Sequence, residues 1–386
     1  MRQISRFMCL VLVAGLLLSC GTTATVPPPS ATPRATAAIE YSAGETAAGA
    51  VTEEPTSLPL SEPGPYYAGK LTLDFEDASR HNRPVGIRVW YPALLPEGLT
   101  APKFLAGEKR DPDRSGAPYP LILSSTQVAS IFAPYLISHG FVWASVDRID
   151  TYDQINEEMI DQPLDILYAL VQVASGLPEE LEGMVDADHA GAIGYSFDGN
   201  NALVLGGARI NPEHYLAQCP SPEPTTEAIL SFTSAFGCGP ARAWDDFAAH
   251  AGEAITASAD GLWQPITDAR IRAVMPLAAE GWWLFGERGL AAVDRPTLMI
   301  VATQDGQYPE NALLFEHLGT PDRALISFVG PGHMMVYDPE MVARMAHFAV
   351  AFFGYHLQGR EELVLYFSED FVEQHDDLAW GLYEGE

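Results

Sequence analysis

Positive charge is scarce in this chain of 386 residues. Lysine and arginine together number 21 against 51 aspartates and glutamates, so the net charge is -30 at pH 7. The lysines are Lys70, Lys103 and Lys109. Because a nucleic-acid-binding protein needs a basic face to neutralise phosphates, nucleic acid is excluded as a partner. The acid excess is typical of a solvated surface that keeps an exported protein soluble, and a salty habitat is the alternative explanation.

Cysteine is also rare, with four in the chain. Cys9 and Cys20 belong to the amino-terminal segment, which leaves Cys219 and Cys238. In an exported protein such a pair is typical of a disulfide, and closing a loop of about 20 residues contributes on the order of 3 kcal/mol. A free, buried pair is the alternative. No histidine stands at ligand spacing from either cysteine, so we expect no metal site there.

Apart from the amino terminus, the sequence lacks an apolar run of transmembrane length. Residues 8–18 are apolar and follow Arg2 and Arg6, but they are too short to span a bilayer as a stable helix. They end in Leu17-Leu18-Ser19-Cys20, which resembles the lipobox of bacterial lipoproteins. We therefore expect residues 1–19 to be a signal peptide and Cys20 to be acylated, which anchors an exported protein to a membrane of the bacterial cell envelope. An ordinary signal peptide with a chance cysteine is the alternative.

Large apolar side chains are few in residues 20–65, where Thr, Ala, Pro, Ser and Glu dominate. Such a segment cannot bury enough surface to offset the entropy lost on ordering, so it is predicted to be a disordered tether. Residues 66–386 are enough for one large domain.

Within that domain, predicted strands alternate with predicted helices. Strands are expected at 70–75, 85–91, 119–123, 141–146, 190–193, 271–277, 296–302 and 324–329, and helices at 129–139, 161–174 and 339–356. After an antiparallel opening pair, this order predicts a mostly parallel central sheet with helices on both faces, the plan of the α/β-hydrolase fold. Residues 208–268 have no steady period and are predicted to be a cap insertion.

A candidate nucleophile lies in residues 188–205. An apolar run enters the turn Gly194-Tyr195-Ser196, and a helix-like pattern follows. This order of strand, turn and helix is the context of a nucleophile elbow, in which Ser196 would attack and the backbone N–H of Phe197 would stabilise an oxyanion. A structural serine in a turn is the alternative. Asp198 occupies the position where an elbow usually has a second small residue.

Candidate partners for this serine follow two later strands. Asp305 comes after the strand at 296–302, and His333 lies on a glycine-rich turn after the strand at 324–329. The chain order Ser, acid, His is that of hydrolases with a catalytic triad, so we expect His333 to be the base. Glu280, one strand earlier, is an alternative acid, because both strand ends can reach the same histidine.

Several segments together resemble a known group of proteins, the bacterial hydrolases similar to platelet-activating factor acetylhydrolase, often labelled predicted dienelactone hydrolases. The segments are Asp77-Ala78-Ser79-Arg80, residues 87–92, Tyr119-Pro120-Leu121, Ser138-His139-Gly140-Phe141, residues 193–197, residues 271–283, Gln307-Tyr308-Pro309 and Gly332-His333. The resemblance covers most of residues 66–357. It implies a cofactor-free serine esterase acting on lipid esters or short-chain acyl esters. The acetylhydrolase pattern places the acid at Glu280, whereas many bacterial relatives place it at Asp305.

Two positions depart from the pattern of this family. The family usually has His-Gly after the Tyr-Pro strand, forming half of the oxyanion hole, and here the chain reads Ser125-Thr126-Gln127-Val128. The N–H of Val128 could still serve, although losing the glycine changes how closely the turn approaches substrate. Asp198 is the second departure.

The sequence therefore predicts an exported, membrane-tethered serine hydrolase that cleaves carboxylic esters, with a lid at 208–268 that sets acyl and alcohol preference. A different class of function is the alternative. The two departures would also suit a lipoprotein that kept the fold, lost efficient catalysis and now binds a ligand or partner. A peptidase is less favoured, because nothing marks an acidic pocket for an amine.

Overall fold

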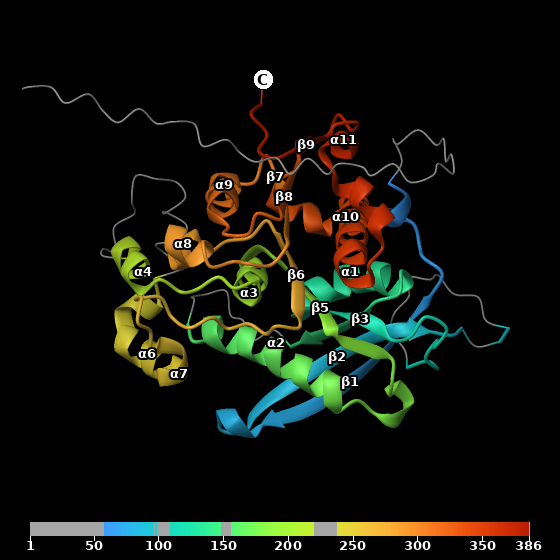
Figure 1. Cartoon of the computed structure of the whole chain (residues 1–386), viewed down its shortest axis with the longest axis horizontal. Coiled ribbons are helices and arrows are strands. Elements are labelled where there is room, and N and C mark those ends of the chain that lie inside the picture. Colours follow the sequence, from blue (N-terminus) through green and yellow to red (C-terminus); the bar gives the residue numbers. More distant parts are fainter. Residues whose placement is uncertain (1–57, 96, 99–108, 148–155, 220–237, 386) are drawn as a thin grey trace, which may run out of the picture. The chain divides into compact units, whose positions relative to one another are not determined.

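The computed structural model describes residues 58–95, 97–98, 109–147, 156–219 and 238–385, and the predicted signal peptide and Cys20 lie outside them. In this part of the chain one sheet has the strand order β1-β2-β4-β3-β5-β6-β7-β8-β9 (Figure 1). The strands are β1 (Tyr67–Asp77), β2 (Arg83–Ala93), β3 (Tyr119–Ser125), β4 (Val142–Val146), β5 (Val185–Tyr195), β6 (Ile271–Leu277), β7 (Thr297–Ala302), β8 (Arg323–Phe328) and β9 (Leu378–Trp380).

The sheet is mostly parallel, as predicted. Strands β3 to β8 pair in parallel, whereas β2 is antiparallel to β1 and β4, and β9 is antiparallel to β8. The predicted antiparallel opening is thus confirmed. Register pairs Tyr195 with Leu277 and Ala302 with Phe328, so β5 and β6 end side by side, as do β7 and β8. The carboxyl ends of the parallel strands form one edge of the sheet, which is where α/β proteins place their sites.

Helices cover both faces of this sheet (Figure 1). The helices are α1 (Thr126–Ser138), α2 (Glu158–Ser175), α3 (Gly199–Leu205), α4 (Pro212–Gln218), α6 (Trp244–Ala251), α7 (Glu253–Thr256), α8 (Trp282–Leu290), α9 (Tyr308–His317), α10 (Pro339–Gln358) and α11 (Glu369–Val372). Alternate strand residues face opposite sides. Accordingly, Ile122 packs in the cluster that holds α1 and α10, whereas Leu121 and Leu123 pack in the one that holds α2.

The predicted strands and helices recur in the structure with small shifts at their ends. Helices α4, α6, α7, α8 and α9, strand β9 and the short helices after α10 were not predicted. In α8 the reason is local, because Gly286 is a poor helix former and divides the helix into two short pieces at φ 53°. Residues 58–65, placed by composition at the end of the tether, pack onto α10, where the Leu60 N–H donates to Nδ1 of His347 at 3.1 Å.

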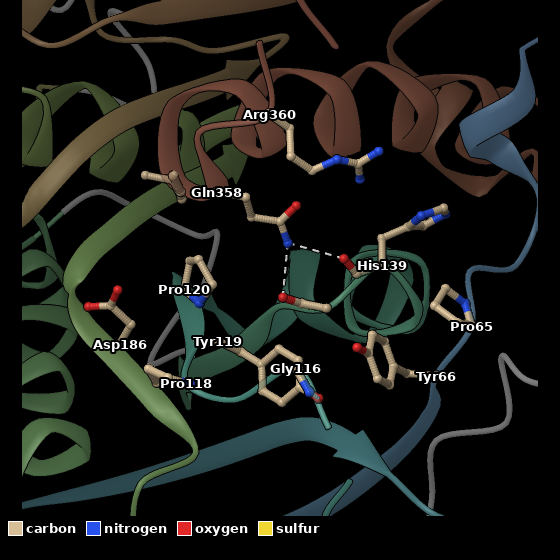
Figure 2. Close-up of a pocket in the computed structure, with 12 residues that line it drawn as sticks. Pro65, Tyr66, Gly116, Pro118, Tyr119, Pro120, His139, Asp186, Gln358 and Arg360 are labelled. Carbon is tan, nitrogen blue, oxygen red and sulfur yellow. Dashed lines mark hydrogen bonds between the residues drawn. The ribbon is translucent and has the colours of Figure 1, made fainter. Parts of the chain in front are cut away.

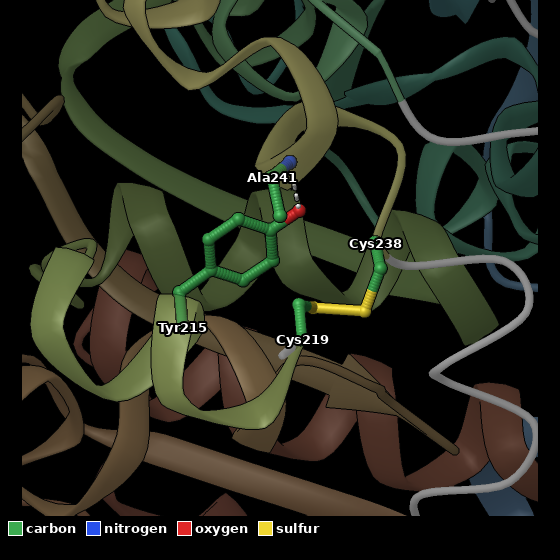
Figure 3. The surroundings of a disulfide bond; sticks show 4 residues. All are labelled: Tyr215, Cys219, Cys238 and Ala241. Atoms are coloured by element: carbon green, nitrogen blue, oxygen red, sulfur yellow. Dashed lines mark hydrogen bonds between the residues drawn. A yellow bond between two sulfur atoms is a disulfide. The ribbon is translucent and has the colours of Figure 1, made fainter. Parts of the chain in front are cut away.

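The described part of the insertion at 208–268 contains the helices α4, α6 and α7 and one disulfide. Cys219 and Cys238 are bonded, so the free-pair alternative is wrong (Figure 3). Beside the bond, the Ala241 N–H donates to the Tyr215 hydroxyl at 3.2 Å. The Tyr215 ring lies 5.8 Å from Trp283 of α8, which fixes the insertion to the body of the domain. None of the helices in the described residues is long and apolar enough to cross a membrane.

Candidate active site

Ser196 lies on a strained turn between β5 and α3. Its φ is 57°, an uncommon conformation for a residue other than glycine, which costs on the order of 1–3 kcal/mol. The turn is tight, because a Cβ on Gly194 would lie 1.9 Å from the carbonyl oxygen of Asp198. A Cβ on Gly199 would lie 2.5 Å from the Cβ of Ala279, which follows β6. Helix α3 therefore passes close to the end of β6 at Gly199.

The serine, the histidine and one acid form a continuous chain of hydrogen bonds. Ser196 Oγ lies 2.8 Å from His333 Nε2, and His333 Nδ1 lies 2.7 Å from Asp305 Oδ2. Because an ionised carboxylate can only accept, Nδ1 carries the proton, and Nε2 accepts from the serine hydroxyl. The Gln307 N–H donates to the other Asp305 oxygen at 2.9 Å. Of the two candidate acids, Asp305 is thus the one that contacts His333.

The surroundings of His333 favour its charged form. Burial would lower the pKa of the imidazole, but the hydrogen bond and charge of Asp305 raise it above the usual value, and Glu280 adds to the shift only when it is ionised. The His333 side chain is 29% exposed, whereas that of Asp305 is 2% exposed. The acid is therefore held in a dry setting in which its charge acts strongly on the imidazole.

Glu280, the alternative acid, lies against the serine. Its Oε1 is 3.4 Å from Ser196 Oγ and accepts from Gln307 Nε2 at 2.8 Å. The residue is 5% exposed. Burial raises the pKa of this carboxyl, although the hydrogen bond from Gln307 opposes the shift. The structure therefore brings both candidate acids to the site, in different positions.

A third carboxyl, Glu310 on α9, was missed by sequence reasoning. It accepts from the N–H groups of Gly281 at 2.8 Å and Trp282 at 3.0 Å, and so braces the loop that carries Glu280. Burial raises its pKa to about 8, and Glu280 contributes to the shift when it is ionised. Nothing local marks Glu310, because an acid in the first turn of a helix is common on surfaces.

The two departures from the family pattern contact each other. Ser125 ends β3, and its hydroxyl donates to Oδ2 of Asp198 in the elbow. This bond places the first turn of α1, which contains Val128, next to the residue that follows Phe197. The first N–H groups of a helix have no partner within the helix and attract negative charge. The oxyanion roles of Phe197 and Val128 stay predictions.

A separate cavity of about 490 Å³ lies toward the other end of the sheet, where Tyr119 and Pro120 begin β3 (Figure 2). Its polar side chains already have partners within the chain. Gln358 Nε2 donates to the carbonyls of His139 at 3.1 Å and Gly140 at 3.0 Å, and Arg360 pairs with Glu362. None of the predicted site residues lines this cavity.

Among the residues that the structure describes, no group of three or more histidine, cysteine, aspartate or glutamate side chains is placed to hold a metal ion. The likeness to acetylhydrolase-like proteins rests on the motifs in the sequence. No family model matches this chain, and no curated protein is similar to it at a significant level.

Proposed function

We propose that this protein is a serine hydrolase of the α/β-hydrolase fold that cleaves carboxylic esters. The observation that carries the proposal is the chain of hydrogen bonds from Asp305 through His333 to Ser196, which has the atoms and the order of a catalytic triad. The strand order supports the fold, since the serine follows β5, the acid β7 and the histidine β8. The strained φ of Ser196 is a further feature of a nucleophile elbow.

In the proposed reaction, His333 Nε2 takes the proton of the Ser196 hydroxyl as Oγ bonds to the ester carbonyl carbon. The carbonyl electron pair moves to its oxygen. When the intermediate collapses, the bond to the alcohol oxygen breaks and Nε2 returns the proton to that oxygen. Water then repeats both steps on the acyl-enzyme, which releases the carboxylic acid and restores the serine. Asp305 stays ionised and stabilises the imidazolium.

The oxyanion would be held by the N–H groups of Phe197 and Val128. The bond between Ser125 and Asp198 supports this proposal, because it joins the two segments that carry these groups. Preorganised donors of this kind contribute about 3–4 kcal/mol each to the rate in known cases. The resemblance to acetylhydrolase-like proteins suggests lipid or short-chain acyl esters as substrates. The insertion at 208–268 would then limit the size of the acyl or alcohol group.

We also propose that the enzyme is exported and lipid-anchored to the bacterial cell envelope through Cys20. The lipobox-like sequence and the predicted tether support this proposal. The disulfide between Cys219 and Cys238 agrees with an oxidising compartment. Metabolic labelling with a radioactive fatty acid tests it. Label should enter the wild type and be absent from Cys20→Ala, and label retained in that variant would contradict acylation at Cys20.

A fluorophosphonate probe tests the proposed activity. It should label the wild type and leave Ser196→Ala unlabelled, and Ser196→Ala should lose turnover of short-chain nitrophenyl esters. Ser175→Ala, which alters an exposed serine on α2, is the matched control and should label like the wild type. A folded wild type that neither labels nor turns over esters would refute the hydrolase and favour the ligand-binding alternative.

A further inference from the structure

Glu280 is a buried acid that contacts Ser196 but takes no part in the proposed triad. Glu280 is 5% exposed, and its carboxyl touches both the Ser196 hydroxyl and the Gln307 amide. A carboxyl placed this close to a nucleophile acts on its reactivity in either protonation state. As an acid it can donate to Oγ, and as a carboxylate it can only accept from the hydroxyl.

The charged groups around Glu280 determine whether its carboxyl is protonated or ionised in the resting protein. Asp305 acts on it with negative charge from the end of β7, and Glu310 on α9 is near enough that the two glutamates oppose each other's ionisation. His333 is the cationic group that faces it, and that imidazole is hydrogen-bonded to Asp305. Three ionised carboxylates buried beside one imidazole would be very unfavourable. Because the imidazole is hydrogen-bonded to Asp305, we infer that the other two carboxyls, Glu280 and Glu310, are protonated.

We propose that Glu280 is a second acid of the active site, which donates a hydrogen bond to Ser196 Oγ in its neutral form and stops the reaction when it ionises. This inference rests on the proposed hydrolase function. Glu280 keeps its proton throughout the reaction, so the transfers between Ser196, His333 and the alcohol stay balanced as described. Its donated bond stabilises negative charge on Oγ both as the serine loses its proton and as the acyl-enzyme breaks down.

Ionisation of Glu280 would oppose catalysis in two ways. The carboxylate would accept a hydrogen bond from the Ser196 hydroxyl. For catalysis, that hydroxyl must instead donate to His333 Nε2. It would also add negative charge beside the position where the oxyanion develops. Burial raises the pKa of Glu280, so this loss occurs above the range in which an ordinary glutamate ionises. Activity should therefore fall on the alkaline side, where the simple triad would stay active.

The pH dependence of kcat/KM on nitrophenyl acetate tests this role. The wild type should lose about tenfold per pH unit above the pKa of Glu280. Glu280→Gln cannot ionise, so its alkaline fall should vanish, with a loss at neutral pH of about tenfold or less. Asp305→Asn should lose about 10⁴-fold on the plateau of the profile. A Glu280→Gln variant as inactive as Asp305→Asn, or one with the alkaline fall of the wild type, would overturn the inference.

A second variant covers the case in which Glu280→Gln does not fold. The Gln307 amide favours the ionised form of Glu280, so Gln307→Leu should move the alkaline fall to higher pH. An unmoved fall would contradict the proposal. Glu287→Gln, an exposed change on α8, is the control for removing one negative charge and should keep the fall of the wild type.

Infrared spectroscopy separates this inference from the hydrolase proposal. At neutral pH the carbonyl band of protonated carboxyls should lose a component in Glu280→Gln and keep it in Glu287→Gln. If the wild type shows that component but neither labels nor hydrolyses esters, the hydrolase proposal fails while the neutral state of Glu280 stands. If the component is missing in the wild type, the proposed role of Glu280 is wrong whatever the activity.

Discussion

The Ser125 hydroxyl donates a hydrogen bond to the Asp198 carboxylate, across 73 residues of sequence. Both side chains are buried, with exposed fractions of 1% and 2%. Asp198 makes no capping bond to the helix α3 that it precedes. The acid at this unusual elbow position thus ties the end of β3 to the elbow.

Removing this contact should weaken both the fold and the proposed site. Ser125→Ala takes a donor from a buried carboxylate, so we expect the free energy of unfolding to fall by about 1–3 kcal/mol. The rate of fluorophosphonate labelling should fall with it, because α1 loses a tie to the elbow. Denaturant unfolding and labelling kinetics measure the two effects. Ser175→Ala should change stability by less than about 0.5 kcal/mol. Equal stability of both variants would show that the bond contributes nothing.

A methyl group at position 199 should disrupt the elbow. Alanine normally stabilises a helix relative to glycine by about 1 kcal/mol. Here the new Cβ would meet Ala279 at 2.5 Å, so Gly199→Ala should instead lower the free energy of unfolding by about 1–3 kcal/mol. Gly306→Ala is the control, because its Cβ would meet nothing within 4 Å. A Gly199→Ala protein more stable than the wild type would contradict the close crossing.

The acid limb of the pH–rate profile should reflect the raised pKa of His333. The base must be neutral to accept the Ser196 proton, so activity should be lost as pH falls through this pKa, which lies above the usual value near 6.5. Asp305→Asn removes the main stabilising partner, so the limb of its residual activity should move to lower pH. Asp376→Asn, an exposed change, should leave the limb in place. The measurement is kcat/KM against pH, and an unmoved limb in Asp305→Asn would exclude the assigned pairing.

Glu310 should make the protein less stable in alkaline solution. Its pKa is raised to about 8 in the folded chain, so between about pH 4.5 and pH 8 the folded state holds a proton that the unfolded state has released. Its contribution to stability is therefore complete below this window and is lost as pH rises through it. Glu310→Gln can still accept from the Gly281 and Trp282 N–H groups. The stability of this variant relative to the wild type should increase across the window in urea unfolding, and a constant difference would disprove the raised pKa.

Much of the fold could be predicted from the sequence, because its signals are local. Period-two alternation marked the opening strands, and apolar runs marked the buried parallel ones. The turn at Gly194-Tyr195-Ser196 and the glycine-rich turn at His333 follow directly from their flanks, and their chain order indicated the site. Strand β9 was missed because three residues carry no period. Helix α8 was missed because Gly286 is a poor helix former and divides it into two short pieces.

The sequence by itself determined the fold class, Ser196 and His333 as candidates, and the existence of two possible acids. Only the tertiary structure decided that Asp305 is hydrogen-bonded to His333, whereas Glu280 contacts Ser196. It also showed that Glu310 accepts from the loop that carries Glu280, and that Ser125 donates to Asp198. The physical reason is that each choice depends on the distances between side chains at the ends of different strands, which lie a few ångströms apart. Those distances are set by how the whole sheet packs, and no local pattern records them.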